Sequence, residues 1–335
     1  MTKRLRVVAA MSSADLLENL FSQDDLAEMV ATVDLDPHVV TGLRDEASIR
    51  ALGGADILLT GWGAPQLDAA ALALAPHLRW VIHTAGTVRR LVTPDLSARG
   101  IRVSKSAVAN ALPVAHYALA MVLLAAKRVL PSSVEYTRDQ HFPSWLGGND
   151  FGNNGAVVGI VGASRTGRRR VERVRPFDHE VLVADPTISA QRAGDMGAEL
   201  VSLDTLLSRS AVVSLHVPLL PATCRLIGDR ELSLMHVGAT LINTARGAVI
   251  DTVALVDHVQ RGRMWAVLDV TDPEPLPPDH ALFTLPQVTL TPHISGSLGN
   301  ELRRLGASAR REIERVQRGL PLVHEVREPD GATSA

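Results

Sequence analysis

Three side chains in the second half of the sequence, Arg246, Glu274 and His293, are of the types that bind a carboxylate and move a proton. Arg246 and His293 each follow a short apolar run, and Glu274 lies in the proline-rich turn 272–275. An arginine can grip a carboxylate with two parallel hydrogen bonds, and it stays charged at any working pH. A histidine gives or takes a proton near neutrality, and a carboxylate behind it fixes its tautomer. Together the three residues predict an acid/base site that acts on a carboxylate-bearing molecule.

Each of these residues also has an ordinary interpretation. A lone arginine after a strand is usually solvated, and a lone histidine usually makes a structural hydrogen bond. Their common position favours function, because all three follow apolar runs that look like parallel strands, and ligands bind beyond the carboxyl ends of such strands.

Short β-branched runs alternate with helical patterns along nearly the whole chain, which predicts an α/β fold with buried parallel strands. We expect strands at residues 5–10, 57–61, 80–84, 157–161, 181–184, 212–216, 240–243, 265–270 and 288–291.

The pattern separates into two parts. One βα series runs to about residue 109, a long helix is expected at about 110–129, and the stretch 131–155, rich in Gly, Pro, Asn and Trp, is expected to be irregular. A second series begins at residue 156. The amphipathic helix expected at 298–318 has no strand partners of its own and should return to the first part. We therefore predict one domain from residues 1–109 plus 297–335 and another from residues 110–296.

Composition indicates an ordinary globular protein. The 335 residues are 46% hydrophobic and 21% charged, and the formal net charge is -2, which gives no reason to expect nucleic acid or an anionic membrane as a partner. The one cysteine, Cys224, excludes an intramolecular disulfide framework and a multi-cysteine metal site, so we expect no metal and a cytoplasmic location. The most apolar helical segment, 111–130, contains His116 and ends in Lys127 and Arg128, and it is not expected to span a membrane.

A dinucleotide site is predicted where the run 157–161 feeds Gly162, followed by a helical pattern, the run 181–184 and Asp185. In such a unit the first glycine allows a tight turn, amides at the helix N-terminus hold the pyrophosphate, and the acid accepts hydrogen bonds from the ribose. Ser164 replaces the second glycine, and Gly167 completes the pattern. An acid at position 185 favours NAD over NADP, because a 2′-phosphate would meet like charge there.

The chain resembles the D-isomer-specific 2-hydroxyacid dehydrogenase family. The matching segments occur in the family's order and spacing and cover nearly the whole chain: GIVGASRTG at 159–167, HVPL at 216–219, INTARG at 242–247, LDV at 268–270 with EP at 274–275, and TPHI at 291–294. The resemblance implies two Rossmann-like, doubly wound parallel-sheet domains, with the cofactor domain inserted into a discontinuous substrate domain.

The resemblance also implies residue roles. Arg246 would bind the substrate carboxylate and carbonyl oxygen, His293 would be the general acid/base, and Glu274 would orient it. Main-chain groups near Gly86 and Thr87 would meet the substrate carboxylate. The implied cofactor-binding residues are Gly162, Ser164, Arg165, Thr166, Gly167, Asp185, Pro218, Thr244, Ala245 and Asp269. Family members are commonly homodimers joined through the cofactor domain.

This chain departs from the family pattern at Ser164, at Val88, where an acid is common, and at His116, where a glutamate is usual. Arg89 and Arg90 follow Val88 and could attract a second anionic group, or they could be solvated. The function expected is NAD-dependent interconversion of a D-2-hydroxy acid and its 2-keto acid. A phosphite dehydrogenase and an NAD-sensing transcriptional corepressor of the same family stay open as alternatives.

Overall fold

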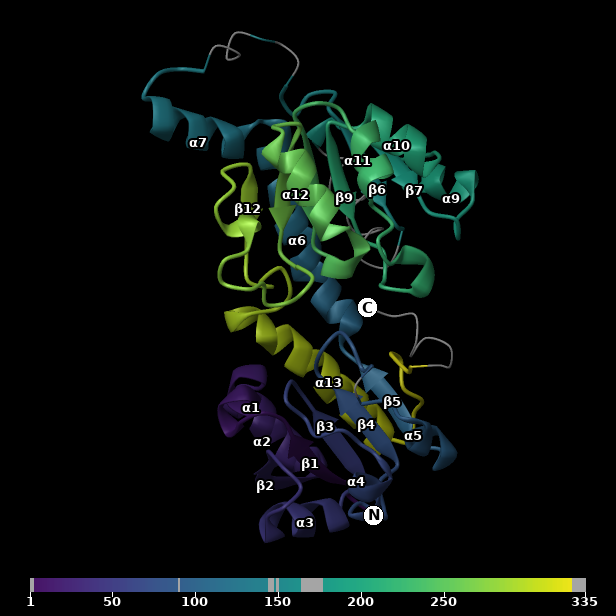
Figure 1. The fold of residues 1–335 in the computed structure, drawn as a ribbon. Helices are drawn as coiled ribbons and strands as arrows, with labels where there is room; N and C mark the ends of the chain where they lie inside the picture. The colour runs from purple at the N-terminus through teal and green to yellow at the C-terminus, as the bar shows by residue number, and fades with distance from the viewer. Residues whose placement is uncertain (1–2, 90, 144–147, 149–150, 164–176, 327–335) are drawn as a thin grey trace. The chain divides into compact units, whose positions relative to one another are not determined.

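A computed structural model describes the chain except for residues 1–2, 90, 144–147, 149–150, 164–176 and 327–335 (Figure 1). The chain divides into two compact units. Unit 1 contains residues 1–110 and 297–335, and unit 2 contains residues 111–296.

Unit 1 is built on a five-stranded parallel sheet in the order β2-β1-β3-β4-β5. This is one of the two common orders of doubly wound sheets. The strands are β1 (Arg6–Ala10), β2 (Asp34–Val40), β3 (Ile57–Thr60), β4 (Trp80–His83) and β5 (Arg102–Lys105). The helices are α1 (Ala14–Leu20), α2 (Gln23–Thr32), α3 (Glu46–Gly53), α4 (Ala69–Ala73), α5 (Pro94–Ala98) and α13 (Leu302–Gln317), which is preceded by the short turn η6 (Gly299–Glu301).

Both faces of this sheet are covered, so its central strands are mainly apolar. Val7 and Val8 are neighbours in β1 and enter opposite cores, because successive side chains of a strand point to opposite faces. One core contains residues of α3, α4 and α5, and the other contains residues of α1 and of α13, including Leu305, Ala309 and Ile313.

Unit 2 contains a seven-stranded parallel sheet in the order β12-β11-β10-β9-β6-β7-β8. The order reverses between β6 and β9, which makes their carboxyl ends the crevice where nucleotides bind in such sheets. The strands are β6 (Val157–Val161), β7 (Glu180–Ala184), β8 (Glu199–Leu200), β9 (Val212–Leu215), β10 (Ala239–Asn243), β11 (Met264–Leu268) and β12 (Val288–Leu290).

Helices cover both faces of the second sheet as well (Figure 1). They are α6 (Ala107–Ala126), α7 (Val129–Asp139), α9 (Ala190–Asp195), α10 (Leu203–Arg209), α11 (Asp229–Leu234) and α12 (Thr252–Gln260), with short turns η3 (Pro221–Thr223), η4 (Gly247–Val249) and η5 (Ala281–Phe283). Residues of α10, α11 and α12 fill one core, and residues of α6 fill the other. The prediction of two parallel α/β sheets is confirmed.

One expectation about a helix is wrong. The stretch expected to be irregular from residue 131 contains α7, because Pro131 lies in the first turn of that helix, where its missing amide hydrogen costs nothing. By length and composition α6 could cross a membrane, since it begins at Ala107 and tolerates His116 within an otherwise apolar run. Core helices of soluble proteins also meet this criterion, and Val122, Ala125 and Ala126 of α6 lie in a core of unit 2.

Candidate active site

The carboxyl ends of β10, β11 and β12 lie level with one another and carry the predicted acid/base residues. Asn243, Leu268 and Leu290 are aligned across the three parallel strands. Arg246 and His293 each follow three residues beyond that line, after β10 and β12 respectively. The edge of the sheet therefore gathers the two side chains in one region of unit 2.

The turn that carries Arg246 is shaped by Asn243, which the sequence analysis did not assign. Asn243 is fully buried, its Nδ2 donates to the carbonyl oxygen of Arg246 at 2.9 Å, and its Oδ1 accepts from the amide of Ala245 at 3.0 Å. Asparagine side chains commonly form turns by hydrogen-bonding to the backbone of nearby residues. The asparagine at the end of this strand was therefore a sign of the turn that the sequence offered. Arg246 Nη1 donates to the carbonyl oxygen of Ala245 at 2.6 Å.

The next residue, Gly247, brings the Arg246 turn against the loop that carries Glu274. A Cβ at Gly247 would lie 2.0 Å from the carbonyl carbon and oxygen of Thr271 and 2.5 Å from the amide nitrogen of Asp272. No side chain fits there, because the obstacles are backbone atoms. The glycine thus sets the distance between two segments that both carry predicted site residues.

His293 and Glu274 form the pair that the sequence predicted. His293 Nδ1 lies 3.0 Å from Glu274 Oε1, and the two side chains are 50% and 43% exposed. A carboxylate can only accept, so Nδ1 carries a proton. His293 has the left-handed φ of 55°, a conformation that is unfavourable for a residue with a Cβ and needs support from its surroundings.

Asp269 provides that support from the end of β11. Its main-chain oxygen accepts the amide of His293 at 2.9 Å, and its side-chain oxygens accept the amides of Ile294 at 2.8 Å and Ser295 at 2.9 Å. Asp269 is 1% exposed. The resemblance implies that this carboxylate holds the nicotinamide, whereas here both of its oxygens already bind the turn after His293.

At the reversal point of the same sheet, Gly162 follows β6 with φ of 95°, and a Cβ there would lie 2.8 Å from Val217 Cγ1 and 3.0 Å from the main chain of His216. Because glycine has no side chain, the main chain of this turn is not covered, as a phosphate-binding turn requires. Pro218 lies two residues beyond His216 in the segment after β9. Ser164, Arg165, Thr166 and Gly167 lie outside the described residues.

Asp185 and Thr244 fit a nucleotide as well. Asp185, at the end of β7, accepts from the amide of Ala163 at 2.5 Å and from the amide and hydroxyl of Thr187 at 2.7 and 2.6 Å. This carboxylate is therefore fixed beside the Gly162 turn. Thr244 is 7% exposed, and its Oγ1 is buried without a hydrogen-bond partner among the described residues, which leaves a polar group for a ligand to satisfy. Its neighbour Ala245 is buried too.

The predicted carboxylate-binding loop lies in unit 1, after β4. Gly86 is close to Asn110, whose Nδ2 would be 3.4 Å from a Cβ at residue 86, and the backbone of Thr87 is hydrogen-bonded to the imidazole of the buried His83. Val88 is buried in a core of unit 1, while Arg89 is exposed. Arg90 lies outside the described residues, and His116 is exposed on α6.

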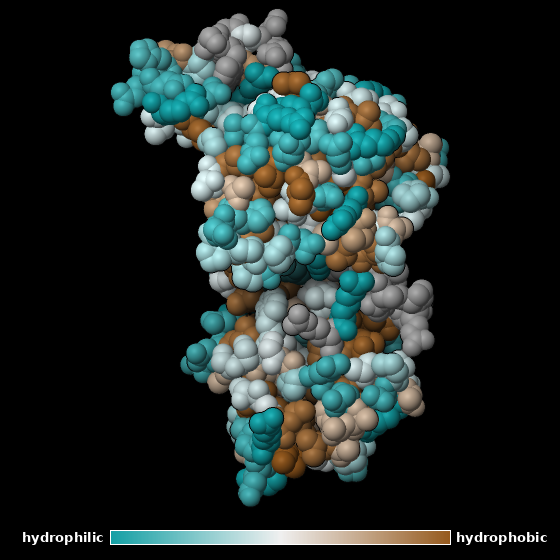
Figure 2. Space-filling view, viewed as in Figure 1, coloured by the Kyte–Doolittle hydropathy of each residue, from teal (hydrophilic) through white to brown (hydrophobic). Residues whose placement is uncertain are grey.

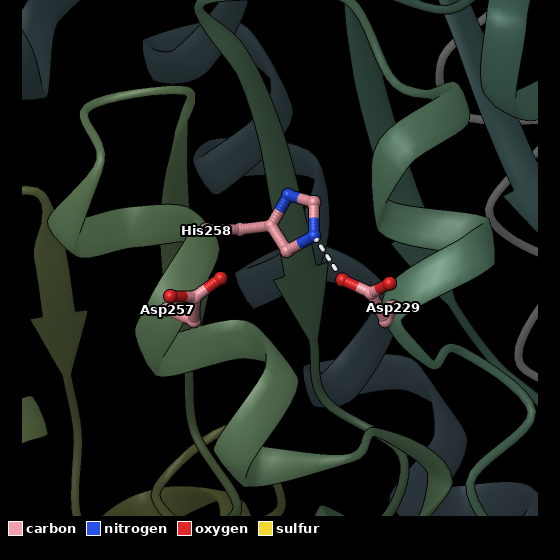
Figure 3. A group of neighbouring side chains, drawn as sticks. All are labelled: Asp229, Asp257 and His258. Carbon is pink, nitrogen blue, oxygen red and sulfur yellow. Dashed lines mark hydrogen bonds and ion pairs between the residues drawn. The ribbon is translucent and has the colours of Figure 1, made fainter.

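A separate group of side chains joins α11 to α12 (Figure 3). The nitrogen and oxygen atoms of Asp229, Asp257 and His258 that could bind a metal lie within 4.8 Å of one another. His258 Nε2 lies 2.8 Å from Asp229 Oδ1, and the Asp257 carboxylate binds the Arg261 guanidinium at 3.0 and 3.1 Å. Both carboxylates already have partners, so we interpret the group as a link between two helices.

Residues 119–295 match the model of the NAD binding domain of the D-isomer specific 2-hydroxyacid dehydrogenases. The chain is 34% identical over 294 residues to D-3-phosphoglycerate dehydrogenase of Mycobacterium bovis, a match that covers 83% of this chain and 54% of that relative. It is 32% identical over 266 residues to glyoxylate reductase of Thermofilum pendens, with 76% of each chain covered. The crystal structure of the TT0316 protein from Thermus thermophilus is similar with a TM-score of 0.74 and 31% identity, covering 96% of this chain and 100% of that one.

The fold and the sheet-edge site thus define an NAD-binding α/β protein. More narrowly, the chain belongs to the D-isomer specific 2-hydroxyacid dehydrogenase family. It spans about half the length of the phosphoglycerate dehydrogenase that it matches.

Proposed function

We propose that the protein is an NAD-dependent oxidoreductase that interconverts a D-2-hydroxy acid and its 2-keto acid. The observation that carries the proposal is the 3.0 Å contact between His293 Nδ1 and Glu274 Oε1 at the carboxyl edge of an NAD-binding sheet. Hydroxy-acid oxidation releases a proton from the hydroxyl group, and keto-acid reduction consumes one. A histidine with one nitrogen fixed by a carboxylate and the other free is suited to both directions.

The residues would divide the work as follows. His293 Nε2 takes the hydroxyl proton during oxidation and returns it during reduction, and Glu274 stabilises the protonated imidazole between the two. Arg246 binds the substrate carboxylate and polarises the carbonyl. NAD supplies the hydride acceptor or donor when it is bound. Gly162, Asp185 and Thr244 would hold it, together with Pro218, Ala245, Asp269 and the segment 164–167.

The test of this function is His293→Gln. Glutamine keeps a hydrogen-bonding side chain but cannot transfer a proton at neutral pH, so keto-acid reduction should slow by about 10²-fold or more. NADH binding, measured by fluorescence, should persist. In the unmodified protein, reduction should be favoured at lower pH than oxidation, since only reduction needs the protonated imidazole. Near-normal turnover of the variant would remove His293 from the mechanism.

The substrate side chain is proposed to carry a second anionic group, because Arg89 is exposed two residues beyond the proposed carboxylate loop. A charge-assisted hydrogen bond would give a roughly 10- to 100-fold preference in kcat/KM for dianionic keto acids. The assay compares 2-ketoglutarate, oxaloacetate and phosphonopyruvate with pyruvate and 2-ketoisocaproate, in the wild type and in Arg89→Ala. If the wild type prefers the apolar keto acids, and Arg89→Ala leaves the ranking of the keto acids unchanged, Arg89 is a solvated residue without a role in substrate choice.

We further propose a cytoplasmic homodimer joined through unit 2. In Figure 1, α7 extends away from the body of that unit. Tyr136 of α7 and Phe142, which follows that helix, stack with ring centroids 5.7 Å apart, and they are 52% and 78% exposed. On the face shown in Figure 2, hydrophobic and hydrophilic surface is interspersed. An exposed aromatic pair is typical of the centre of an interface. Light scattering should give a dimer, and Phe142→Asp should shift it toward the monomer.

A further inference from the structure

Tyr117, on α6, ends a chain of hydrogen bonds that leads to the turn of His293. Its hydroxyl lies 2.7 Å from Thr291 Oγ1, which in turn lies 2.6 Å from Asp269 Oδ1. Neither Tyr117 nor Thr291 is among the residues that hold the cofactor or the substrate in the function proposed above. Tyr117 was not among the residues predicted from the sequence.

The direction of the hydrogen bonds is fixed by the number of protons available. The Asp269 carboxylate can only accept, so the single hydroxyl proton of Thr291 is donated to it. Thr291 then has only lone pairs left for Tyr117, and the tyrosine hydroxyl must be the donor. Burial, together with the nearby Asp269 charge, raises the pKa of Tyr117, which keeps this donor protonated.

Asp269 connects these hydrogen bonds to the acid/base residue His293. The oxygen that accepts from Thr291 also accepts the amide of Ile294, and the other side-chain oxygen accepts the amide of Ser295. The main-chain oxygen of Asp269 holds the amide of His293 itself. The three amides follow one another along the chain, so Asp269, through its main-chain oxygen and its carboxylate, fixes the turn in which His293 has its left-handed conformation.

We propose that Tyr117 is a positioning residue for His293, acting through Thr291 and Asp269. The proposal rests on the function proposed above. The network meets His293 at its main chain, while the imidazole is bound by Glu274. Tyr117 therefore sets where the imidazole lies and does not carry its proton.

The first test is Tyr117→Phe, with Tyr136→Phe as the matched control, because the chain has only these two tyrosines. Loss of one neutral hydrogen bond should lower kcat for keto-acid reduction by about 3- to 10-fold. The KM of the keto acid and the Kd of NADH should stay within twofold, approximately, since no binding group is removed. Tyr136→Phe should leave all three unchanged. A wild-type kcat in Tyr117→Phe overturns the proposal, and so does a change confined to KM.

The second test asks whether Thr291 is the intermediary. Thr291→Ser keeps the hydroxyl and should stay close to the wild type. Thr291→Val keeps the shape, removes both hydrogen bonds and should lower kcat more than Tyr117→Phe does. In the Thr291→Val background, the added Tyr117→Phe change should have no further effect. An undiminished effect of Tyr117→Phe in that background means that the tyrosine acts by another route.

A readout that needs no activity separates this proposal from the proposed function. Hydrogen exchange of the amides at residues 293–295 should be faster in Tyr117→Phe than in the wild type, and unchanged in Tyr136→Phe. Unaltered exchange in Tyr117→Phe shows that the turn does not depend on Tyr117 and overturns the proposal. A wild-type protein that reduces no 2-keto acid overturns the proposed function instead, while faster exchange would still support the role of Tyr117 in holding the turn.

Discussion

His83 is buried at the end of β4, where its Nδ1 lies 2.9 Å from Thr60 Oγ1. Burial and the positive charge of Lys105 together lower the pKa of His83 to about 4, against a hydrogen bond to the backbone of Thr87. Between this value and the ordinary value of 6.5, the unfolded chain binds a proton that the folded chain does not. The stabilisation that comes from neutral His83 is thus complete above pH 6.5 and is lost as the pH falls toward 4.

We therefore predict that the free energy of unfolding falls by about 2 kcal/mol between pH 7 and pH 5 through His83 alone. His83→Gln, which keeps a hydrogen-bonding side chain but does not titrate, should lose this part of the pH dependence although it is less stable at pH 7. The change in the free energy of unfolding between pH 7 and pH 5 is measured by urea unfolding of both proteins. An equally steep fall in the variant would assign the acid sensitivity to other groups.

Asp185 should decide the choice between the two nicotinamide dinucleotides. Its fixed carboxylate would repel a 2′-phosphate and accept from a free ribose hydroxyl, so the protein should prefer NADH, and Asp185→Ala should narrow the preference. The measurement is kcat/KM for NADH and NADPH. Thr187→Val, which removes one hydroxyl partner of Asp185 and no charge, is the control and should keep the preference. Equal use of NADPH by the wild type would show that Asp185 does not face the ribose.

At the residue scale, the residues that would carry the chemistry could be predicted better than the residues that hold them in place. Side-chain type and position after a strand are enough to select Arg246 and His293, and the structure brings His293 to Glu274, although the catalytic roles of all three stay predictions. The supporting contacts of Tyr117 could not be predicted, because they join residues 174 positions apart and depend on which face of a helix meets which strand end.

Among the structural elements, the contact between the Arg246 turn and the Glu274 loop makes a sharp prediction. In Gly247→Ala the new methyl group meets the backbone of Thr271, which must move, so we expect a loss of about 1–3 kcal/mol in stability and a clear fall in kcat/KM. Gly194→Ala is the control. It lies in α9 with open space around it and should be neutral or slightly stabilising. Normal activity in Gly247→Ala would mean that the spacing of the two segments is not critical.

The strands that the sequence predicted are those whose residues are apolar on both faces, such as β1, β3 and β10. Three strands were not predicted: β2, β5 and β8. β2 contains Pro37 and several polar residues and pairs with β1 alone, β5 reads RVSK, and β8 has only two residues. β2 is partly exposed and contains a proline, which edge strands tolerate, and β5 is mostly buried but has three polar residues among its four, so neither has the apolar signal. The arrangement of the strands in two doubly wound sheets was implied by the family resemblance and not by periodicity.

In the molecule as a whole, unit 1 depends on a helix supplied by the far end of the chain. Gly306 of α13 packs so closely on the end of α1 that a Cβ there would lie 1.9 Å from the carbonyl oxygen of Leu20. Gly306→Ala should improve helix propensity and still lower stability by about 1–3 kcal/mol, because the backbone contact cannot be kept. Hydrogen exchange should become faster throughout unit 1 and stay unchanged in unit 2. Uniformly faster exchange in both units would show that they unfold together.

The discontinuity of unit 1 also sets the order in which the protein can be completed on the ribosome. The strands β1, β3 and β4 emerge early, but Leu305, Ala309 and Ile313, which share their core, follow only after the whole of unit 2. Translation of these roughly 190 residues takes about 10 to 40 s, during which part of the sheet's apolar face is uncovered. Unit 2 is contiguous and can fold as soon as it is made. The part of the protein that is synthesised first is therefore the last to become native, and in that interval it is the natural target of chaperones.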